Sequence, residues 1–320
     1  MIFAFNTAHS QRAVFLCRNF FEGEMFMSKS IFKGVATALI TPLNSNGVDY
    51  DNFAKVIDWQ LEQGINALVI AGTTGEGSTL DDAEHKAVVK FAVERINHRC
   101  PVIAATGSND TRYAVQLTKF CCDVGADAML VVTPYYNKTT QNGLIKMYTT
   151  IADASTKPLI LYNVPSRTGI NIEPETYAVL ADHPMIGGIK EANSNIEKIV
   201  KTASLVHGKM DIYSGNDDQI VPILSMRGKG VISVLSNPMP KKTMEICDKF
   251  FAGDVEGAAK LQCEMLPMIN ALFCETNPIP VKFAMSKMGF CENYVRLPLV
   301  TMEKAHADKL EMLMKEQGVI

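Results

Sequence analysis

Eight times from Gly34 onward, an apolar run is followed by a turn rich in Gly, Asn or Thr and then by an amphipathic stretch. The apolar runs are continuous, which is typical of parallel strands buried on both faces. Eight strand–helix units of roughly 25–30 residues predict a (β/α)8 barrel of about 250 residues. The predicted strands are Gly34–Ile40, Ala67–Ala71, Val102–Ala105, Ala128–Thr133, Leu159–Tyr162, Ile186–Lys190, Met210–Ser214 and Gly230–Val234.

An open, doubly wound sheet is the alternative α/β fold. It requires a G-x-G-x-x-G turn after the first strand, but the residues after Ile40 are Thr41-Pro42-Leu43-Asn44. The length of 320 residues and the hydrophobic fraction of 47% suit one large α/β domain with an appendage, or two modest domains. We therefore predict an α/β protein with a TIM barrel.

The amphipathic stretches between the strands predict helices. Tyr50–Gln63 has one apolar face and ends before Gly64, a helix stop. Thr79–Asn97 begins with Thr79 as the predicted cap. Three helices after the eighth strand exceed what the barrel needs and indicate a C-terminal helical appendage. They are Lys241–Phe251, Val255–Cys274 and Ala305–Glu316. The predicted division is a barrel over residues 31–252 and a helical region over residues 253–320.

The ends and the composition restrict the location and the partners. Residues 1–26 are aromatic-rich and aperiodic and lack the features of a secretory signal, so we expect residues 1–30 to be a poorly ordered extension. The net charge of −3 does not indicate a nucleic-acid partner. No apolar run approaches the ~20 residues that cross a bilayer. The eight cysteines show no C-x-x-C spacing, so we expect a cytoplasmic protein without a metal site.

Unusual polar residues follow the predicted strands at their carboxyl ends, where the active sites of barrel enzymes lie. These residues should meet at one end of the barrel. They are Gly72-Thr73-Thr74-Gly75-Glu76-Gly77, Thr133-Pro134-Tyr135-Tyr136-Asn137, Tyr162-Asn163-Val164-Pro165-Ser166-Arg167-Thr168-Gly169, Lys190 and Ser214-Gly215-Asn216-Asp217-Asp218.

Lys190 ends an apolar run, and a buried ammonium there is unfavourable unless it is paired or neutralised. One interpretation is a structural lysine in a salt bridge. The other is an amine whose pKa lies below its reference of ~10.4, which frees a lone pair to attack a carbonyl. The polar residues at the other strand ends favour the second interpretation.

Those polar residues also allow two interpretations each. The Gly72–Gly77 turn is not a phosphate P-loop, because no Gly-Lys-Ser/Thr follows, but its amides and hydroxyls could hold a carboxylate. Tyr162 is either a core tyrosine or a proton donor, and Arg167 is either a solvated cation or a carboxylate ligand. Together with a lysine nucleophile they predict a Schiff-base site.

At these residues the chain resembles the dihydrodipicolinate synthase family, the 4-hydroxy-tetrahydrodipicolinate synthases, within the pyruvate-dependent class I aldolase superfamily. The resemblance runs from about Phe32 to the C-terminus. The Gly-Thr-Thr-Gly-Glu and Ile-Lys-Glu motifs mark the superfamily, and the tyrosine–arginine loop is more specific. Besides the segments above, the matching motifs are Gly188-Ile189-Lys190-Glu191, Gly230-Val231-Ile232-Ser233 and Asn277-Pro278-Ile279-Pro280-Val281-Lys282.

The resemblance implies an enzyme of lysine and diaminopimelate biosynthesis that condenses pyruvate with L-aspartate 4-semialdehyde. Lys190 would form the imine with pyruvate. Thr73, Tyr162 and Tyr136 would form a proton relay, with Tyr136 reaching in from a neighbouring subunit of a homotetramer, a dimer of dimers. The imine is the electron sink, so the resemblance implies no metal and no organic cofactor.

The resemblance also implies the substrate contacts. Thr74 and the adjacent amide would hold the pyruvate carboxylate. Gly215 and Ile232 would line the same pocket through backbone groups. Arg167 would bind the carboxylate of the semialdehyde.

Two other functions are compatible with a barrel of this kind. N-acetylneuraminate lyase, or another pyruvate-dependent aldolase, would share Lys190 and Tyr162 but is not expected to carry Arg167 in this loop or the Tyr135-Tyr136 pair. An arginine suits a small carboxylate, whereas hydroxyl and amide partners suit a sugar chain. A catalytically silent barrel or a transcriptional regulator should lack Lys190 or Tyr162 or carry a DNA-binding segment, and the sequence shows neither.

Many members of the family are inhibited by L-lysine, which binds near the residue that matches Tyr135. In the lysine-sensitive pattern a glutamate occupies the position of Tyr113 and a histidine that of Asp82, while His85 and Asn109 are kept here. The resemblance therefore implies weak or absent inhibition by lysine.

Overall fold

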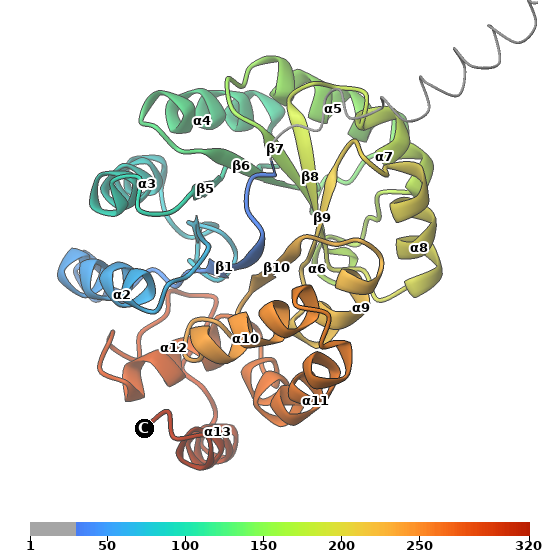
Figure 1. Cartoon of the computed structure of the whole chain (residues 1–320). Coiled ribbons are helices and arrows are strands. Elements are labelled where there is room, and N and C mark those ends of the chain that lie inside the picture. The colour runs from blue at the N-terminus through green and yellow to red at the C-terminus, as the bar shows by residue number, and fades with distance from the viewer. Residues whose placement is uncertain (1–29) are drawn as a thin grey trace, which may run out of the picture.

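The computed structural model describes residues 30–320 and shows a closed barrel of eight parallel strands (Figure 1). The predicted N-terminal extension lies outside these residues except for Ser30. Each strand lies within two residues of its predicted bounds, so the predicted (β/α)8 barrel is confirmed. The strands are β1 (Gly34–Ala38), β4 (Ala67–Ile70), β5 (Val102–Ala105), β6 (Ala128–Val132), β7 (Leu159–Asn163), β8 (Ile186–Glu191), β9 (Asp211–Ser214) and β10 (Gly230–Ser233).

Strand β1 closes the barrel, because it pairs in parallel with both β4 and β10. Gly34 and Gly230 lie opposite each other at the junction of β1 and β10. A Cβ atom on Gly230 would lie 1.8 Å from the Gly34 carbonyl oxygen. The close approach of the two strands therefore requires glycine at position 230.

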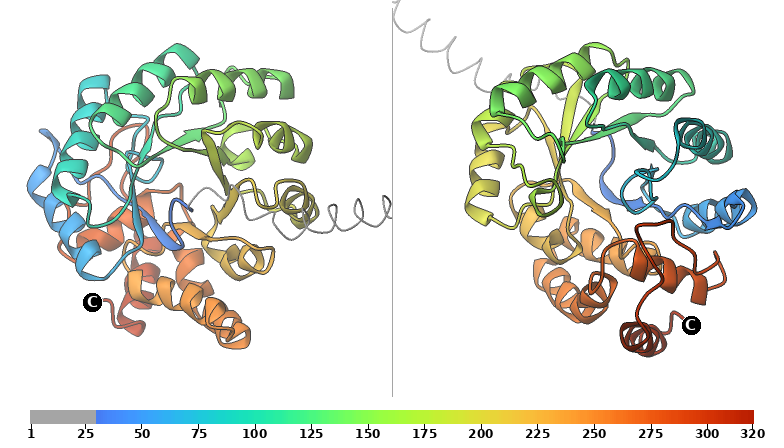
Figure 2. Two further views of the ribbon diagram at one scale, coloured as in Figure 1. Left: turned by 45° about the horizontal axis from the view of Figure 1, so that its top comes forward. Right: turned by 180° about the vertical axis from the view of Figure 1, so that it is seen from behind.

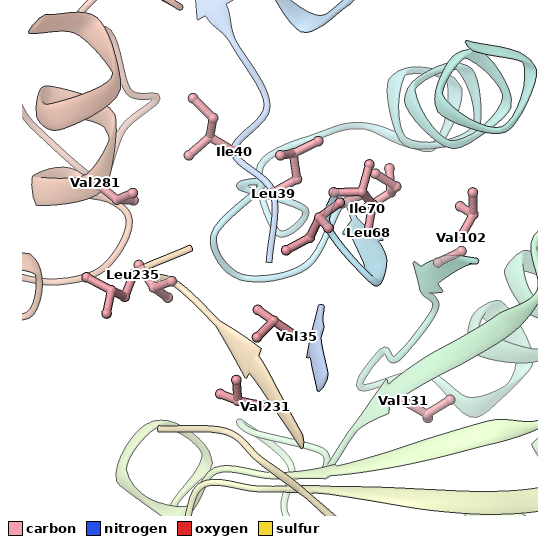
Figure 3. Packing of buried hydrophobic residues seen from close by; sticks show 14 of the residues in the cluster. Val35, Leu39, Ile40, Leu68, Ile70, Val102, Val131, Val231, Leu235 and Val281 are labelled. Carbon is pink, nitrogen blue, oxygen red and sulfur yellow. The ribbon is translucent and has the colours of Figure 1, made fainter. Parts of the chain in front are cut away.

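Side chains of the barrel strands point alternately into two apolar layers. The inner layer, which includes Ala36 and Ile160, fills the barrel. The outer layer, which includes Val35 and Leu68, packs between the strands and the helices (Figure 3). This alternation decides which strand residues can reach a ligand at the mouth of the barrel.

Helices surround the barrel on all sides (Figures 1 and 2). The helix Pro240–Phe251, α10, packs against β1. It is therefore the eighth helix of the barrel, and its assignment to the appendage was wrong. A small antiparallel pair, β2 (Leu43–Asn44) and β3 (Gly47–Val48), was not predicted. The other barrel helices are α2 (Tyr50–Glu62), α3 (Asp82–Ile96), α4 (Thr111–Asp123), α5 (Gln141–Asp153), α6 (Pro165–Thr168), α7 (Pro174–Leu180), α8 (Ile196–Leu205) and α9 (Ile220–Ser225), with a 3-10 turn η1 (Asp217–Gln219) before α9.

Helix α3 begins later than predicted, and its cap is Asp81 instead of Thr79. The Glu84 N–H donates to the Asp81 carboxylate at 2.8 Å, and the Asp81 N–H donates to the Glu84 carboxylate at 3.2 Å. This reciprocal capping box satisfies two backbone N–H groups at once. The Thr79 hydroxyl instead donates to the Glu76 carbonyl oxygen in the preceding turn.

The C-terminal region contains three helices, α11 (Val255–Leu272), α12 (Ile279–Lys287) and α13 (Lys304–Glu316) (Figure 1). Helices α11 and α13 were predicted, whereas α12 was not. Pro278 and Pro280 indicate a loop in the sequence, but proline is tolerated in the first turn of a helix. The boundary at residue 252 remains a prediction. Between residues 30 and 320, no helix combines the length and apolar character needed to cross a membrane.

Candidate active site

A cavity of about 570 Å³ opens at the carboxyl ends of the barrel strands. Its walls come from the turns after β4, β5, β6, β7, β8 and β9 and from the C-terminal region. The fold brings six of the eight predicted site residues together in this lining. They are Thr73, Thr74, Tyr162, Arg167, Lys190 and Gly215.

Lys190 is buried inside the barrel near the end of β8. It pairs in register with Tyr162 on β7, so both side chains point inward. Its Nζ lies 4.2 Å from the centroid of the Tyr162 ring, and the residue is 6% exposed. Within residues 30–320 the amine forms no ion pair. This geometry argues against a structural lysine held by a salt bridge.

Burial lowers the pKa of Lys190 to about 7, with a further lowering by the charge of Arg167, whereas Asp217 raises it. A large share of the amine is therefore uncharged at neutral pH and carries the lone pair that a nucleophile needs. Asp217 is 2% exposed, and its Oδ2 accepts hydrogen bonds from the N–H groups of Val234 and Leu235. Its Oδ1 has no partner among the described residues. The sequence analysis named Asp217 among the polar residues after the seventh predicted strand but gave it no role.

Tyr162 holds its proton more strongly than a free tyrosine. Burial raises the pKa of its phenol, against smaller opposing effects of Arg167 and of a hydrogen bond from Thr73. The phenol therefore stays protonated at neutral pH. A protonated phenol that contacts a hydroxyl and lies beside an uncharged amine is a suitable path for protons.

Asn277 connects two of the predicted binding residues, although the sequence analysis did not include it among them. Its Nδ2 donates to Thr74 Oγ1 at 3.0 Å, and its carbonyl oxygen accepts from Arg167 Nη2 at 3.2 Å. Thr74 and Asn277 are 3% and 6% exposed. The Asn277-Pro278 motif was the only signal for this residue in the sequence, and it did not show the contact across 203 residues.

Two predicted site residues lie outside the cavity lining. Ile232 is buried in the inner layer of the barrel, and Val234 lines the cavity after the same strand. Tyr136 is 91% exposed, whereas its neighbour Tyr135 is part of the lining. The single chain therefore does not bring Tyr136 to Lys190.

The chain matches the model of the dihydrodipicolinate synthetase family over residues 31–317. It belongs to this family. The match covers nearly all of the described residues, and the resemblance inferred from the strand-end motifs is confirmed.

Similar proteins agree in their names and in their folds. The 4-hydroxy-tetrahydrodipicolinate synthase of Acetivibrio thermocellus is 50% identical over 294 residues, which are 92% of this chain and 100% of that protein. The structure of a monomeric dihydrodipicolinate synthase variant has a TM-score of 0.89 and 42% identity, with 91% of this chain and 98% of that chain covered. The structure of the chloride-inhibited dihydrodipicolinate synthase of Acinetobacter baumannii, complexed with pyruvate, has a TM-score of 0.88 and 42% identity. The match covers 90% of this chain and 99% of that chain.

Proposed function

We propose that this chain is a lyase that condenses pyruvate with L-aspartate 4-semialdehyde to 4-hydroxy-tetrahydrodipicolinate, a step of lysine and diaminopimelate biosynthesis. The names of its relatives favour this activity over that of N-acetylneuraminate lyase. The observation that carries the proposal is the buried amine of Lys190, which forms no ion pair with any residue from 30 to 320 and lies beside the Tyr162 phenol. A cytoplasmic location remains a prediction from the cysteine usage.

The reaction would begin when the Lys190 amine adds to the keto carbon of pyruvate and loses water to give an imine. The Thr73–Tyr162 pair would carry the protons of these steps, and Thr74 would hold the pyruvate carboxylate. Loss of a proton from the methyl group gives an enamine, which attacks the aldehyde. The substrate amine then displaces Lys190, and the ring closes.

Borohydride trapping tests the nucleophile directly. Incubation with pyruvate and borohydride should produce one mass adduct, located at Lys190 by peptide mapping. Product should form from aspartate semialdehyde and none from N-acetylneuraminate. Product from N-acetylneuraminate alone would establish the lyase instead.

Arg167→Ala should weaken the binding of aspartate semialdehyde about ten- to a hundredfold, because a hydrogen bond to a charged group contributes about 1.5–3 kcal/mol. Imine formation with pyruvate should persist. Steady-state kinetics in the second substrate, together with borohydride trapping, measure both effects. Arg95→Ala, which removes a surface arginine paired with Asp58, is the control. Unchanged semialdehyde affinity with lost trapping would contradict the assignment.

A homotetramer, built as a dimer of dimers, is the assembly that we propose. The exposed Tyr135 and Tyr136 at the mouth of the cavity support one interface, and exposed Ile196 and Val200 on α8 support a second. Sedimentation should show a tetramer at assay concentration, and Tyr136→Phe should lower turnover without dissociating it. A fully active monomer would contradict the proposal, and one similar structure is of a monomeric variant.

Inhibition by L-lysine should be weak, with a midpoint above about a millimolar. Tyr113 lines the cavity, and burial, followed by the nearby Asp82 carboxylate, raises its pKa to about 12. A neutral phenol there cannot pair with an ammonium group as a carboxylate can. Tyr113→Glu should strengthen lysine inhibition about tenfold or more, whereas Tyr113→Phe should not. A wild-type midpoint far below a millimolar would refute this prediction.

A further inference from the structure

The turn that carries Thr73 and Thr74 ends at Glu76, a residue in the left-handed region with φ of 54°. The Glu76 N–H donates to the Thr73 carbonyl oxygen, and the Gly77 N–H donates to the Gly72 carbonyl oxygen. A residue other than glycine in this conformation costs about 1–3 kcal/mol and persists only where its surroundings hold it. The two hydroxyls at the active site therefore depend on what fixes Glu76.

The Glu76 carboxylate is held by the C-terminal region. Its Oε1 lies 2.5 Å from Nζ of Lys282 on α12, and the two side chains are 1% and 0% exposed. Its Oε2 accepts a hydrogen bond from the Arg296 N–H at 3.0 Å. The Arg296 guanidinium in turn forms an ion pair with Glu84 on α3. Both carboxylate oxygens are thus satisfied by residues more than 200 positions away.

The C-terminal region also contacts the turn of Thr73 and Thr74 at another residue. Asn277, five positions before Lys282, donates to the Thr74 hydroxyl. Helix α12 is itself fixed in the core, because its Val281 is fully buried (Figure 3). The turn is therefore attached to α12 through Lys282 and to the segment just before that helix through Asn277.

Stability alone does not explain a buried ion pair here. Taking two charges out of water is unfavourable, and replacing such a pair by neutral residues of similar volume is often neutral or stabilising. Charge-assisted hydrogen bonds are, however, shorter and about twice as strong as neutral ones, so a paired carboxylate holds its direction and distance more firmly. What the pair fixes is the turn beside Lys190.

We propose that Glu76 and Lys282 form a positioning pair, which holds the hydroxyls of Thr73 and Thr74 in register with the Lys190 amine. The C-terminal region is then part of the catalytic apparatus. This inference rests on the proposed roles of Thr73 and Thr74. Neither Glu76 nor Lys282 lines the cavity, so both act through the turn.

The test compares two double variants that each neutralise one ion pair of α12. Glu76→Gln with Lys282→Met removes the buried pair. Lys287→Met with Glu311→Gln removes the partly exposed pair between α12 and α13, whose atoms lie 2.7 Å apart. The measurements are thermal unfolding, the pyruvate concentration that half-saturates borohydride trapping, and kcat/KM.

A misplacement of about 1 Å can cost about a hundredfold in rate. We therefore expect the buried-pair variant to fold, to need about tenfold more pyruvate for half-saturation, and to lose about ten- to a hundredfold in kcat/KM. The control should stay within about twofold of the wild type, because a partly exposed pair contributes little. Glu76→Gln alone leaves the buried Lys282 ammonium without a counter-charge, so it should lower the unfolding temperature more than the double variant does, and it should shift the pyruvate midpoint in the same direction.

Three results separate the possibilities. A folded double variant with the wild-type pyruvate midpoint would overturn the inference. Failure of both Glu76 variants to fold would also overturn it, because the pair would then serve folding and not positioning. Wild-type protein that traps pyruvate but forms no product from the semialdehyde would contradict the proposed function only, since the pyruvate midpoint does not depend on the second substrate.

Discussion

We expect Lys190→Arg to abolish borohydride trapping of pyruvate and to lower turnover at least about a thousandfold. Arginine is of similar length but is always charged and has no titratable lone pair, so it cannot form an imine. The barrel should remain folded, because the amine forms no ion pair that the change would break within residues 30–320. Mass spectrometry after trapping and steady-state kinetics measure the two effects.

The pH dependence provides an independent check on the same residue. The pKa of Lys190 is lowered to about 7, chiefly by burial. Below this pH the amine is protonated and inert, and above it the lone pair is free, so the rate of trapping should rise with pH and level off above about pH 8. Lys198→Arg, at a salt bridge with Glu173 on the outer surface, should leave the profile unchanged. Near-normal turnover of Lys190→Arg would end the Schiff-base hypothesis.

The second large effect is expected for Tyr162→Phe, which should lower kcat by about a hundred- to ten-thousandfold, the usual contribution of a general acid–base group. Phenylalanine keeps the ring that lies 4.2 Å from the Lys190 amine. It removes only the hydroxyl, whose pKa the nearby Thr73 lowers slightly. Imine formation should be slower but still detectable by trapping at long times.

A second buried tyrosine is a matched control for this change. Tyr148 on α5 is fully buried, and its hydroxyl donates to the Val131 carbonyl oxygen at 3.4 Å, away from the cavity lining. Tyr148→Phe should cost about 1 kcal/mol of stability and leave kcat unchanged. Equal activities for the two phenylalanine variants would remove Tyr162 from the proton relay.

Local patterns predicted most of the secondary structure. The β2–β3 pair was not predicted, and helix α12 and the start of α3 are two further exceptions. Helix α12 begins with prolines, which are also typical of loops. Helix α3 is capped by Asp81 because Asp81 and Glu84 pair, but Thr79, another residue type that caps helices, precedes them in the sequence. In both cases two local signals competed, and the hydrogen bonds of the folded chain decided between them.

Some of the candidate site residues could likewise be predicted from the sequence, whereas others could not. Lys190 and Tyr162 could be inferred from chemistry that is unusual at the end of an apolar run, and Arg167 from its place in the loop after such a run. Asp217 and Asn277 could not, because an aspartate or asparagine in a polar turn has no distinctive pattern in a sequence. Their place beside the cavity is evident only from burial and from contacts such as that of Asn277 with Thr74.

The barrel could be predicted from the residues alone, because eight continuous apolar runs alternating with amphipathic stretches are typical of parallel strands buried on both faces. The proposal that Lys190 is the nucleophile also began there, because a lysine at the end of such a run is chemically exceptional. The pKa of Lys190 and the place of the C-terminal region required the tertiary structure. Burial inside the closed barrel is the main cause of the lowered pKa of Lys190. The place of the C-terminal region depends on the contact between Glu76 and Lys282 in the core. These residues are 206 positions apart, and no local pattern in the sequence encodes such a contact.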